Sequence, residues 1–313
     1  MPGLYLLLLL TGSLSFALPL QISNFASPAY WGMAHSGGAI ADVHNAYWLN
    51  PSLTSSDIPY SLTLNEAFLP GTGISISEFS GHYHIRPGHT VTGGLNMENY
   101  GRFDARNIEG ELTGEFSASQ YQYFIGYAHR VSRRFAIGGQ LVLFGNRIDQ
   151  SREQHVFLRY GLSYTFGERD NMLAFSGVTD GLQNRWRMSF SHELEYLPLR
   201  LNVDFRWYGD DRDAMSFWDP GDQDFDLGGA VHYFAEKLTL GAQIRAVENL
   251  KLMAGFDLAR LNLNRNAFGL DTIISGMAIG GQYTLKQLEF SLGLYHYAQF
   301  TTMTALGISY LGK

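Results

Sequence analysis

Cysteine is absent from the 313-residue sequence, which excludes disulfide bonds, thiolate metal sites and a cysteine nucleophile. The chain also has no excess of basic residues, because 22 Lys and Arg face 29 Asp and Glu, a formal net charge of −7. Nucleic-acid binding usually requires a basic stripe, so we expect no nucleic acid as a partner. Beyond residue 17 no apolar run approaches the about 20 residues that a transmembrane helix needs. A membrane protein with this profile, in which aromatic residues reach 14%, would have to be a β-barrel.

The first 17 residues have the features of a targeting segment. The apolar run over residues 4–10 is too short to span a bilayer as a helix. Residues 15–17, Ser-Phe-Ala, then give the small-x-small pattern that a signal peptidase cleaves. We therefore predict a signal peptide over residues 1–17. A buried N-terminal helix is the alternative.

After residue 58 the chain consists mainly of short segments in which apolar and polar residues alternate. In residues 199–208 one face of the predicted strand carries Leu, Val, Phe and Trp, and the other is mostly charged. Residues 238–246 and 287–294 repeat the pattern. A soluble sandwich would turn the apolar face to its core, whereas a transmembrane barrel turns it to lipid and the polar face to the lumen. We predict an all-β protein, a transmembrane antiparallel barrel.

The number of strands follows from a count and a parity rule. Fifteen segments fit, but a single-chain bacterial barrel normally has an even number of strands. We therefore expect about fourteen and place the extra candidate between residues 226 and 260. Connections at 129–133 and 197–198 are typical of periplasmic turns, and 101–115 and 209–225 of outer loops. The candidate strands are 58–68, 74–85, 89–100, 116–129, 134–146, 154–166, 171–179, 186–196, 199–208, 226–234, 238–247, 250–260, 272–284, 287–297 and 301–310.

Residues 18–57 do not fit this pattern. Their central part, 23–53, shows no sustained period of two or 3.6 and contains small residues and turn residues. Because it resembles neither a strand nor a long helix, we predict a plug, or hatch, in the lumen of the barrel built by residues 58–313. The motif on which this prediction depends is Gly37, Gly38, Asp42, Asn50 and Pro51.

Three charged residues, Arg200, Asp204 and Arg206, alternate with apolar ones in the 199–208 segment. A charge on the lipid face at the bilayer midplane costs roughly 2–4 kcal/mol, so we expect these side chains to point into the lumen. They would hold the plug through ion pairs with Asp42, line a pore, or pair within the barrel wall. The sequence leaves these three roles open.

Two groups of residues have metal-ligand chemistry. His82 and His84 share one face of a predicted strand, with His89 nearby, but the sequence identifies no further ligand, which favours luminal or interface histidines. The connection 209–226 could bind calcium or a partner, although it lacks the EF-hand order and a solvated acidic loop is preferred. Its acidic residues are Asp210, Asp211, Asp213, Asp219, Asp222, Asp224 and, at its end, Asp226. We predict no resident metal and no cofactor.

Catalytic motifs are missing from the sequence. It has no Gly-x-Ser-x-Gly elbow, no His-Glu-x-x-His and no phosphate-binding loop. Barrel enzymes that place Ser and His on neighbouring strands exist, but no such pair stands out here. We therefore predict that the protein is not an enzyme.

Several short motifs occur in an order that resembles the FadL-like outer-membrane barrels. The N-terminal pattern of that family is similar to Gly37-Gly38-Ala39, Asp42 and Asn50-Pro51-Ser52-Leu53. Within the superfamily, which includes PorV and PorQ proteins of the type IX secretion system, the chain looks most like the PorQ group. The segments that carry this likeness are 99–101, 108–118, 197–200, 276–280 and 294–296.

The resemblance implies a barrel of about fourteen strands with an N-terminal plug in the outer membrane of a Gram-negative bacterium. It further implies a non-enzymatic role in type IX protein secretion, in which the barrel anchors a surface protein such as PorZ. The alternative is a FadL-like channel for hydrophobic or small solutes. A contiguous apolar site in the lumen would favour the channel, whereas an anchor needs only a filled barrel.

Overall fold

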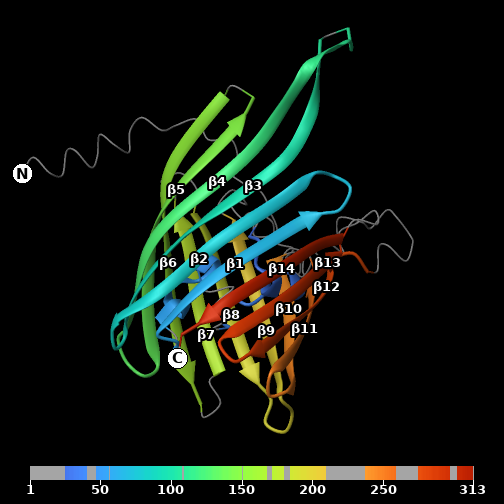
Figure 1. Ribbon diagram of the computed structural model, residues 1–313. Helices are drawn as coiled ribbons and strands as arrows, with labels where there is room; N and C mark the ends of the chain where they lie inside the picture. Colours follow the sequence, from blue (N-terminus) through green and yellow to red (C-terminus); the bar gives the residue numbers. More distant parts are fainter. Residues whose placement is uncertain are drawn as a thin grey trace, which may run out of the picture.

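The computed structural model describes residues 25–40, 47–55, 57–107, 109–149, 151–167, 171–179, 184–208, 237–258, 274–296 and 302–312. Within these residues fourteen antiparallel strands close into one barrel, which confirms the expected fold class (Figure 1). Each strand pairs with its neighbours in sequence, and β1 pairs with β14 to complete the ring. The strands are β1 Tyr60–Leu69, β2 Ile74–Arg86, β3 His89–Arg106, β4 Leu112–Arg130, β5 Phe135–Ile148, β6 Ser151–Phe166, β7 Asn171–Thr179, β8 Asn184–Glu193, β9 Leu199–Tyr208, β10 Leu238–Val247, β11 Leu250–Asp257, β12 Met277–Leu285, β13 Leu288–His296 and β14 Thr302–Leu311.

Fourteen of the fifteen predicted segments coincide with these strands, and the remaining one, 226–234, lies outside the described residues. One expectation was wrong. Residues 101–115 were expected to form a loop, but they extend β3 and β4 into a long hairpin that projects beyond the barrel (Figure 1). Pairing continues there because Phe103 lies opposite Phe116, which is a favourable cross-strand pair. The opposed carboxylates of Asp104 and Glu115 each have an arginine partner, Arg106 at 2.9 Å and Arg102 at 3.8 Å.

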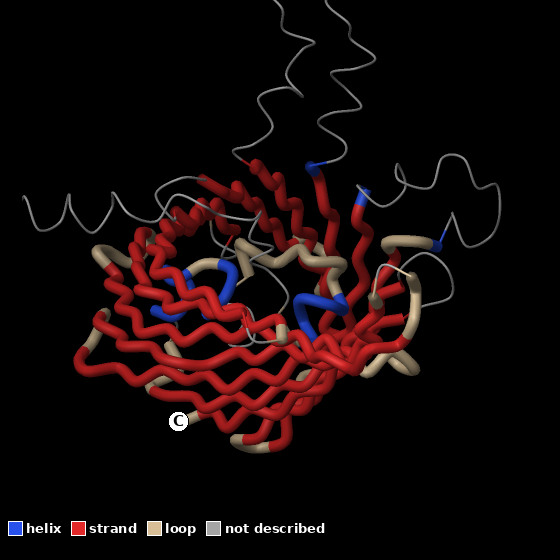
Figure 2. Tube along the Cα trace, turned by 90° about the horizontal axis from the view of Figure 1, so that it is seen from above, coloured by secondary structure: helices blue, strands red, loops and turns tan. Residues whose placement is uncertain are grey.

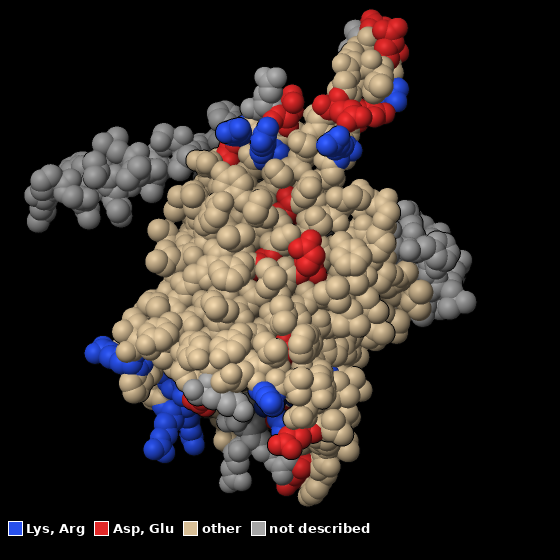
Figure 3. Space-filling model, viewed as in Figure 1, with Lys and Arg blue, Asp and Glu red and all other residues tan. Residues whose placement is uncertain are grey.

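The strands are apolar outside and polar inside. On β1, Leu62 and Leu64 are 52% and 56% exposed, whereas Thr63 and Asn65 are buried. Glu66 is the only charged residue on the outer face of this strand. In the view of Figure 3, Lys and Arg gather at the two ends, and the band between them is mostly uncharged, with some Asp and Glu near its centre. Such a large exposed apolar surface is stable only against an apolar medium, which identifies the outer face as lipid-facing.

The two ends of the barrel differ. The connections β2–β3, β4–β5, β6–β7, β8–β9, β10–β11 and β12–β13 are short and share one end, called here the short-turn rim. The turns expected at 129–133 and 197–198 are among them. Near this rim exposed tyrosines follow the outer face, the position at which aromatic side chains sit at the level of lipid headgroups. They are Tyr83, Tyr127, Tyr164, Tyr283 and Tyr310.

Residues 25–40 and 47–55, called here the inner segment, lie inside the ring of strands (Figure 2). Helix α2 (Pro28–Gly32) begins where the Ser27 hydroxyl accepts a hydrogen bond from the Tyr30 amide at 3.2 Å, and proline occupies its first turn. The 3₁₀ helix η1 spans Pro51–Ser55. Helix α2 contacts β11 to β14, and η1 contacts β3 to β6, so the inner segment touches opposite parts of the wall. None of the helices among the described residues is long and apolar enough to cross a membrane.

Candidate functional site

The first contact between the inner segment and the wall is at Asp204. Its carboxylate is fully buried and accepts a hydrogen bond from the Gly38 amide at 3.1 Å and from Asn202 at 2.8 Å. Arg187 of the neighbouring strand lies 3.3 Å from the same carboxylate. Gly38 must be small here, because a Cβ would lie 2.9 Å from Cδ of Arg187. The structure therefore brings together two residues that the sequence analysis singled out separately.

The other two predicted luminal charges have different partners. Arg206 forms an ion pair with Asp257 at 2.9 Å, and the second oxygen of Asp257 lies 3.3 Å from Nδ1 of His35 in the inner segment. Arg200 instead pairs with Glu193 within the wall at 2.7 Å. Arg206 is thus connected to the inner segment through Asp257, whereas Arg200 is not. Asp42, the partner considered for these charges, lies outside the described residues.

The Asn50–Pro51 pair lies against the opposite part of the wall. Asn50 donates to the carbonyl oxygen of Leu162 at 3.2 Å, and its Oδ1 accepts from the amide and hydroxyl of Ser52 at 3.1 and 2.8 Å. Two wall glycines make room for this turn. A Cβ at Gly161 would lie 2.9 Å from Asn50 Cγ, and one at Gly138 would lie 2.5 Å from the carbonyl carbon of Pro51. Sequence reasoning missed both glycines, because a glycine in a strand does not reveal whether another chain segment approaches it.

The three histidines singled out from the sequence, His82, His84 and His89, have protein partners. Nε2 of His82 donates to the carbonyl oxygen of Ile58 at 2.8 Å, and Nδ1 accepts from the Tyr47 hydroxyl at 2.8 Å. His84 stacks on His82, and His89 stacks on His129. Within the described part of the chain, no group of three or more His, Asp or Glu side chains could hold a metal ion. The aspartates from Asp210 to Asp226 lie outside that part.

The lumen contains an apolar cluster that the alternation did not predict. Aromatic residues of the inner segment, including Phe25 and Trp48, pack against buried residues of β4, β5 and β6. Trp48 contacts Phe124 edge-on at 4.8 Å between ring centroids and stacks on Phe25 at 5.3 Å. The expectation of a polar luminal face therefore does not hold for this part of the wall. The signal in the sequence was Phe157, which breaks the alternation of its strand by placing an aromatic residue on the luminal face.

Arg159 is the one cation of the described residues whose guanidinium lies over the rings of this cluster. Arg159 is 1% exposed, and its guanidinium carbon lies 5.4 Å from the ring centroid of Trp48 and 6.0 Å from those of Phe25 and Phe157. Nη1 donates to Gln140 at 2.9 Å, while Nε and Nη2 have no hydrogen-bond partner. No Asp or Glu of the described residues forms an ion pair with it. Aromatic faces compensate part of the desolvation of a buried guanidinium, and its remaining donors can bind an acceptor oxygen.

Comparison with known proteins gives a likeness in fold but none in sequence. No protein-family model matches the chain, and no characterised protein matches it by sequence. The toluene transporter TbuX of Ralstonia pickettii aligns with a TM-score of 0.59 at 12% identity, over 92% of this chain and 98% of that one. The toluene transporter TodX of Pseudomonas putida gives 0.59 at 10% identity, over 92% and 96%.

A FadL homologue of Pseudomonas aeruginosa aligns with a TM-score of 0.54 at 11% identity, over 92% of this chain and 98% of that chain. Identities this low establish a shared fold and do not carry a solute from one protein to another. The similarity to the PorQ group of the type IX secretion system stays a prediction. The chain has the fold of the FadL-type outer-membrane barrels.

Proposed function

We propose that the protein is an outer-membrane channel for small hydrophobic solutes. The observation that supports this proposal is the buried aromatic cluster in the lumen, whose rings lie around the guanidinium of Arg159. An apolar solute gains free energy when it leaves water for such a lining, at about 25 cal/mol per Å² of apolar surface buried. Ligand sites for small hydrophobic molecules are lined in this way, mostly by apolar and aromatic side chains with few polar groups.

Arg159 would make the proposed path favour apolar solutes that carry one polar group. Its unpartnered nitrogens would bind the oxygen of a carboxylate or hydroxyl group at one end of an otherwise apolar solute. The inner segment fills this part of the lumen, so passage requires that it moves away from the wall. Its contacts with the wall are hydrogen bonds, ion pairs and packing, which break and re-form reversibly.

Solute uptake by a Gram-negative host that lacks channels of this kind tests the proposal. Cells with the protein should accumulate a radiolabelled monoaromatic hydrocarbon faster than cells with an empty vector, and should take up glucose at an unchanged rate. Phe157→Ser, which makes the luminal cluster polar, should reduce hydrocarbon uptake, whereas Leu158→Ala on the outer face should leave it unchanged. Equal uptake with and without the protein would contradict the proposal.

A second function, suggested by the likeness to PorQ, is that of a type IX secretion component that anchors a surface protein such as PorZ. The observation that favours it is the projecting β3–β4 hairpin. Phe103 and Phe116 stack on one face of this hairpin at 5.3 Å between centroids, and Leu112 is 61% exposed near its tip. Exposed apolar side chains on a projecting element are a common feature of protein-binding surfaces.

Affinity purification from native outer membranes in mild detergent tests this second function. A partner recovered in stoichiometric amount with the unaltered protein should be lost from the double variant Phe103→Ser, Phe116→Ser. The matched control is Leu64→Ala, which changes an exposed apolar residue on the barrel wall instead of the hairpin. The hairpin projects beyond the barrel, whereas the aromatic cluster lies in the lumen (Figure 1). The double variant should therefore lose the partner but keep its rate of hydrocarbon uptake, which separates the two functions.

A further inference from the structure

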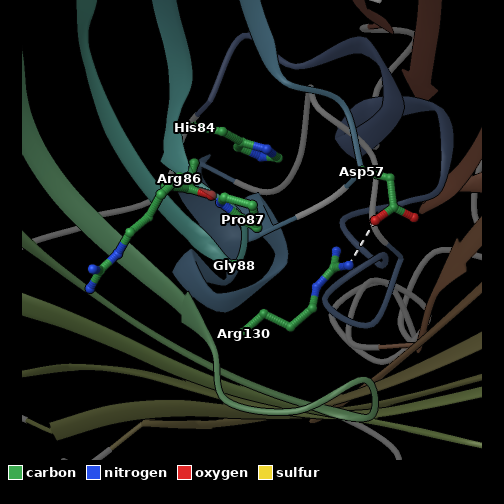
Figure 4. A pocket seen from close by; sticks show the side chains of 7 residues that line it. Asp57, His84, Arg86, Pro87, Gly88 and Arg130 are labelled. Atoms are coloured by element: carbon green, nitrogen blue, oxygen red, sulfur yellow. Dashed lines mark hydrogen bonds and ion pairs between the residues drawn. The ribbon is translucent and has the colours of Figure 1, made fainter.

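A cavity of about 400 Å³ lies at the short-turn rim. It is connected to the aromatic cluster of the lumen through His82, which contacts Tyr47 of that cluster and stacks on His84 of the cavity. It is bounded by the connection that follows η1 and by the ends of β2, β3 and β4 (Figure 4). The side chains that matter for its chemistry are those of Asp57, His84, Thr90 and Arg130, and the β2–β3 turn at Gly88 forms its floor. Neither the proposed transport path nor the predicted plug motif includes these residues.

The guanidinium of Arg130 is the principal positive group of the cavity. Its Nη1 donates to Oδ1 of Asp57 at 2.7 Å, and Figure 4 shows the two side chains facing one another while Arg86 points away. The Asp57 side chain is 92% exposed, so this ion pair lies in water and contributes little to stability. A carboxylate is therefore already accommodated by Arg130, and another carboxylate can compete for its place.

The wall of the cavity has buried polar atoms without a hydrogen-bond partner. Thr90 is 1% exposed, and its Oγ1 has no hydrogen-bond partner; Nε2 of His84 likewise has none. Buried polar groups without a partner are uncommon in native structures and point to a missing ligand or water. Thr90 is among the residues that line the cavity, where its hydroxyl can donate to a bound acceptor. The backbone there is satisfied, because Gly88 accepts from the amide of Arg130 at 2.8 Å.

The charge at this rim favours an anion. The residues that line the cavity carry two guanidinium groups, of Arg130 and of Arg86, whose side chain points away, and one carboxylate, of Asp57 (Figure 4).

We infer that this cavity binds a small carboxylate, held by the Arg130 guanidinium and the Thr90 hydroxyl in place of Asp57. The ligand takes over the contact that Asp57 makes, and its second oxygen accepts from the threonine. Binding therefore releases the ion pair between Arg130 of β4 and Asp57, which lies in the connection between η1 and β1. This inference does not depend on the proposed channel activity.

Titration of the full-length protein in mild detergent tests the inference, with sodium acetate as the probe at constant ionic strength and calorimetric detection. Acetate should bind at one site with roughly millimolar affinity. Arg130→Gln should weaken binding at least about tenfold, and Thr90→Val, which keeps the shape and removes the hydroxyl, about threefold or more. Asp57→Asn should strengthen binding severalfold, because it removes the competing carboxylate.

Two matched controls distinguish binding in this cavity from a general effect of the net charge at the short-turn rim. Arg133→Gln removes an exposed cation from the β4–β5 turn, and Glu248→Gln removes an exposed anion from the β10–β11 turn. Neither should change acetate affinity by more than about twofold, and an effect of Arg133→Gln equal to that of Arg130→Gln would overturn the inference. Inorganic phosphate bound in preference to acetate would overturn the choice of a carboxylate. If Arg130→Gln does not fold, the other two variants still test the inference, because Thr90→Val should weaken acetate binding and Asp57→Asn should strengthen it.

Discussion

Replacement of Gly161 by alanine should loosen the inner segment from the wall. The new methyl group would lie 2.9 Å from Asn50 Cγ and 3.1 Å from Pro51 Cδ. Carbon atoms in contact prefer about 3.5–4.0 Å, so Asn50 has to retreat by at least about 0.6 Å. Its hydrogen bond to the Leu162 carbonyl, already 3.2 Å long, then exceeds the normal range.

The cost can be worked out from these two effects. Overpacking of this kind costs about 1–3 kcal/mol, and a lost hydrogen bond about 0.5–1.5 kcal/mol. The sum, about 1.5–4.5 kcal/mol, weakens docking of the inner segment roughly tenfold to a thousandfold, at 1.4 kcal/mol per factor of ten. If the inner segment plugs the lumen, ion conductance of the variant has to rise.

Conductance in planar bilayers measures the effect. Gly161→Ala, and also Gly138→Ala, should give larger or more frequent openings than the unaltered protein. Gly139→Ala is the matched control, because a Cβ there meets no atom closer than 4.0 Å. Heat-modifiable migration in gels should show that all three barrels are folded. Conductance of Gly161→Ala equal to that of Gly139→Ala would refute the plug and the reasoning above.

Three further predictions concern the wall. Asp204→Asn leaves Arg187 without its buried counter-ion, so we expect a loss of about 3–5 kcal/mol, measured by denaturant unfolding in detergent; an unchanged midpoint would contradict this role of the ion pair. Arg159→Met should leave hydrocarbon uptake intact and reduce uptake of the corresponding aromatic carboxylate by about tenfold or more, and equal effects on both solutes would argue against a head-group contact. Leu64→Arg should lower stability in lipid vesicles by roughly 2–4 kcal/mol, whereas a variant as stable as the parent would show that this outer face does not meet the bilayer core.

The strands were predictable from the sequence because lipid imposes a strict rule on one face. A residue such as Leu62 or Leu64 has to be apolar when it faces the bilayer, and period two follows. Because a closed single-chain barrel normally has an even number of strands, the count of fifteen candidates could be reduced to fourteen. The hairpin at 101–115 was not predicted, because outside the bilayer the same rule no longer applies and its strands carry charges on both sides of the Phe103–Phe116 pair.

The luminal contacts could be predicted only in part. Inward placement of Asp204 follows from the cost of a charge in lipid, but its partner Gly38 depends on how the inner segment is threaded through the barrel. The role of Gly161 depends on its contact with Asn50, and that of Arg159 on its contact with Trp48. In both pairs the partner is more than a hundred residues away in the sequence. Local pattern contains no information on such pairs. The cavity at Arg130 is of the same kind, since the ends of three strands and a connection form it together.

The attachment of the inner segment to late strands has a consequence for the order of folding. Gly38 meets an acceptor 166 residues further along the chain, and His35 meets one 222 residues further. Contacts at such separation form late, because the intervening chain has to be ordered first. The N-terminal residues are synthesised first, yet their partners on β9 and β11 exist only after most of the wall has assembled. The closing of the β1–β14 seam therefore has to wait for, or occur together with, the enclosure of the N-terminal part, so insertion of this barrel couples the first described residues to the last strand.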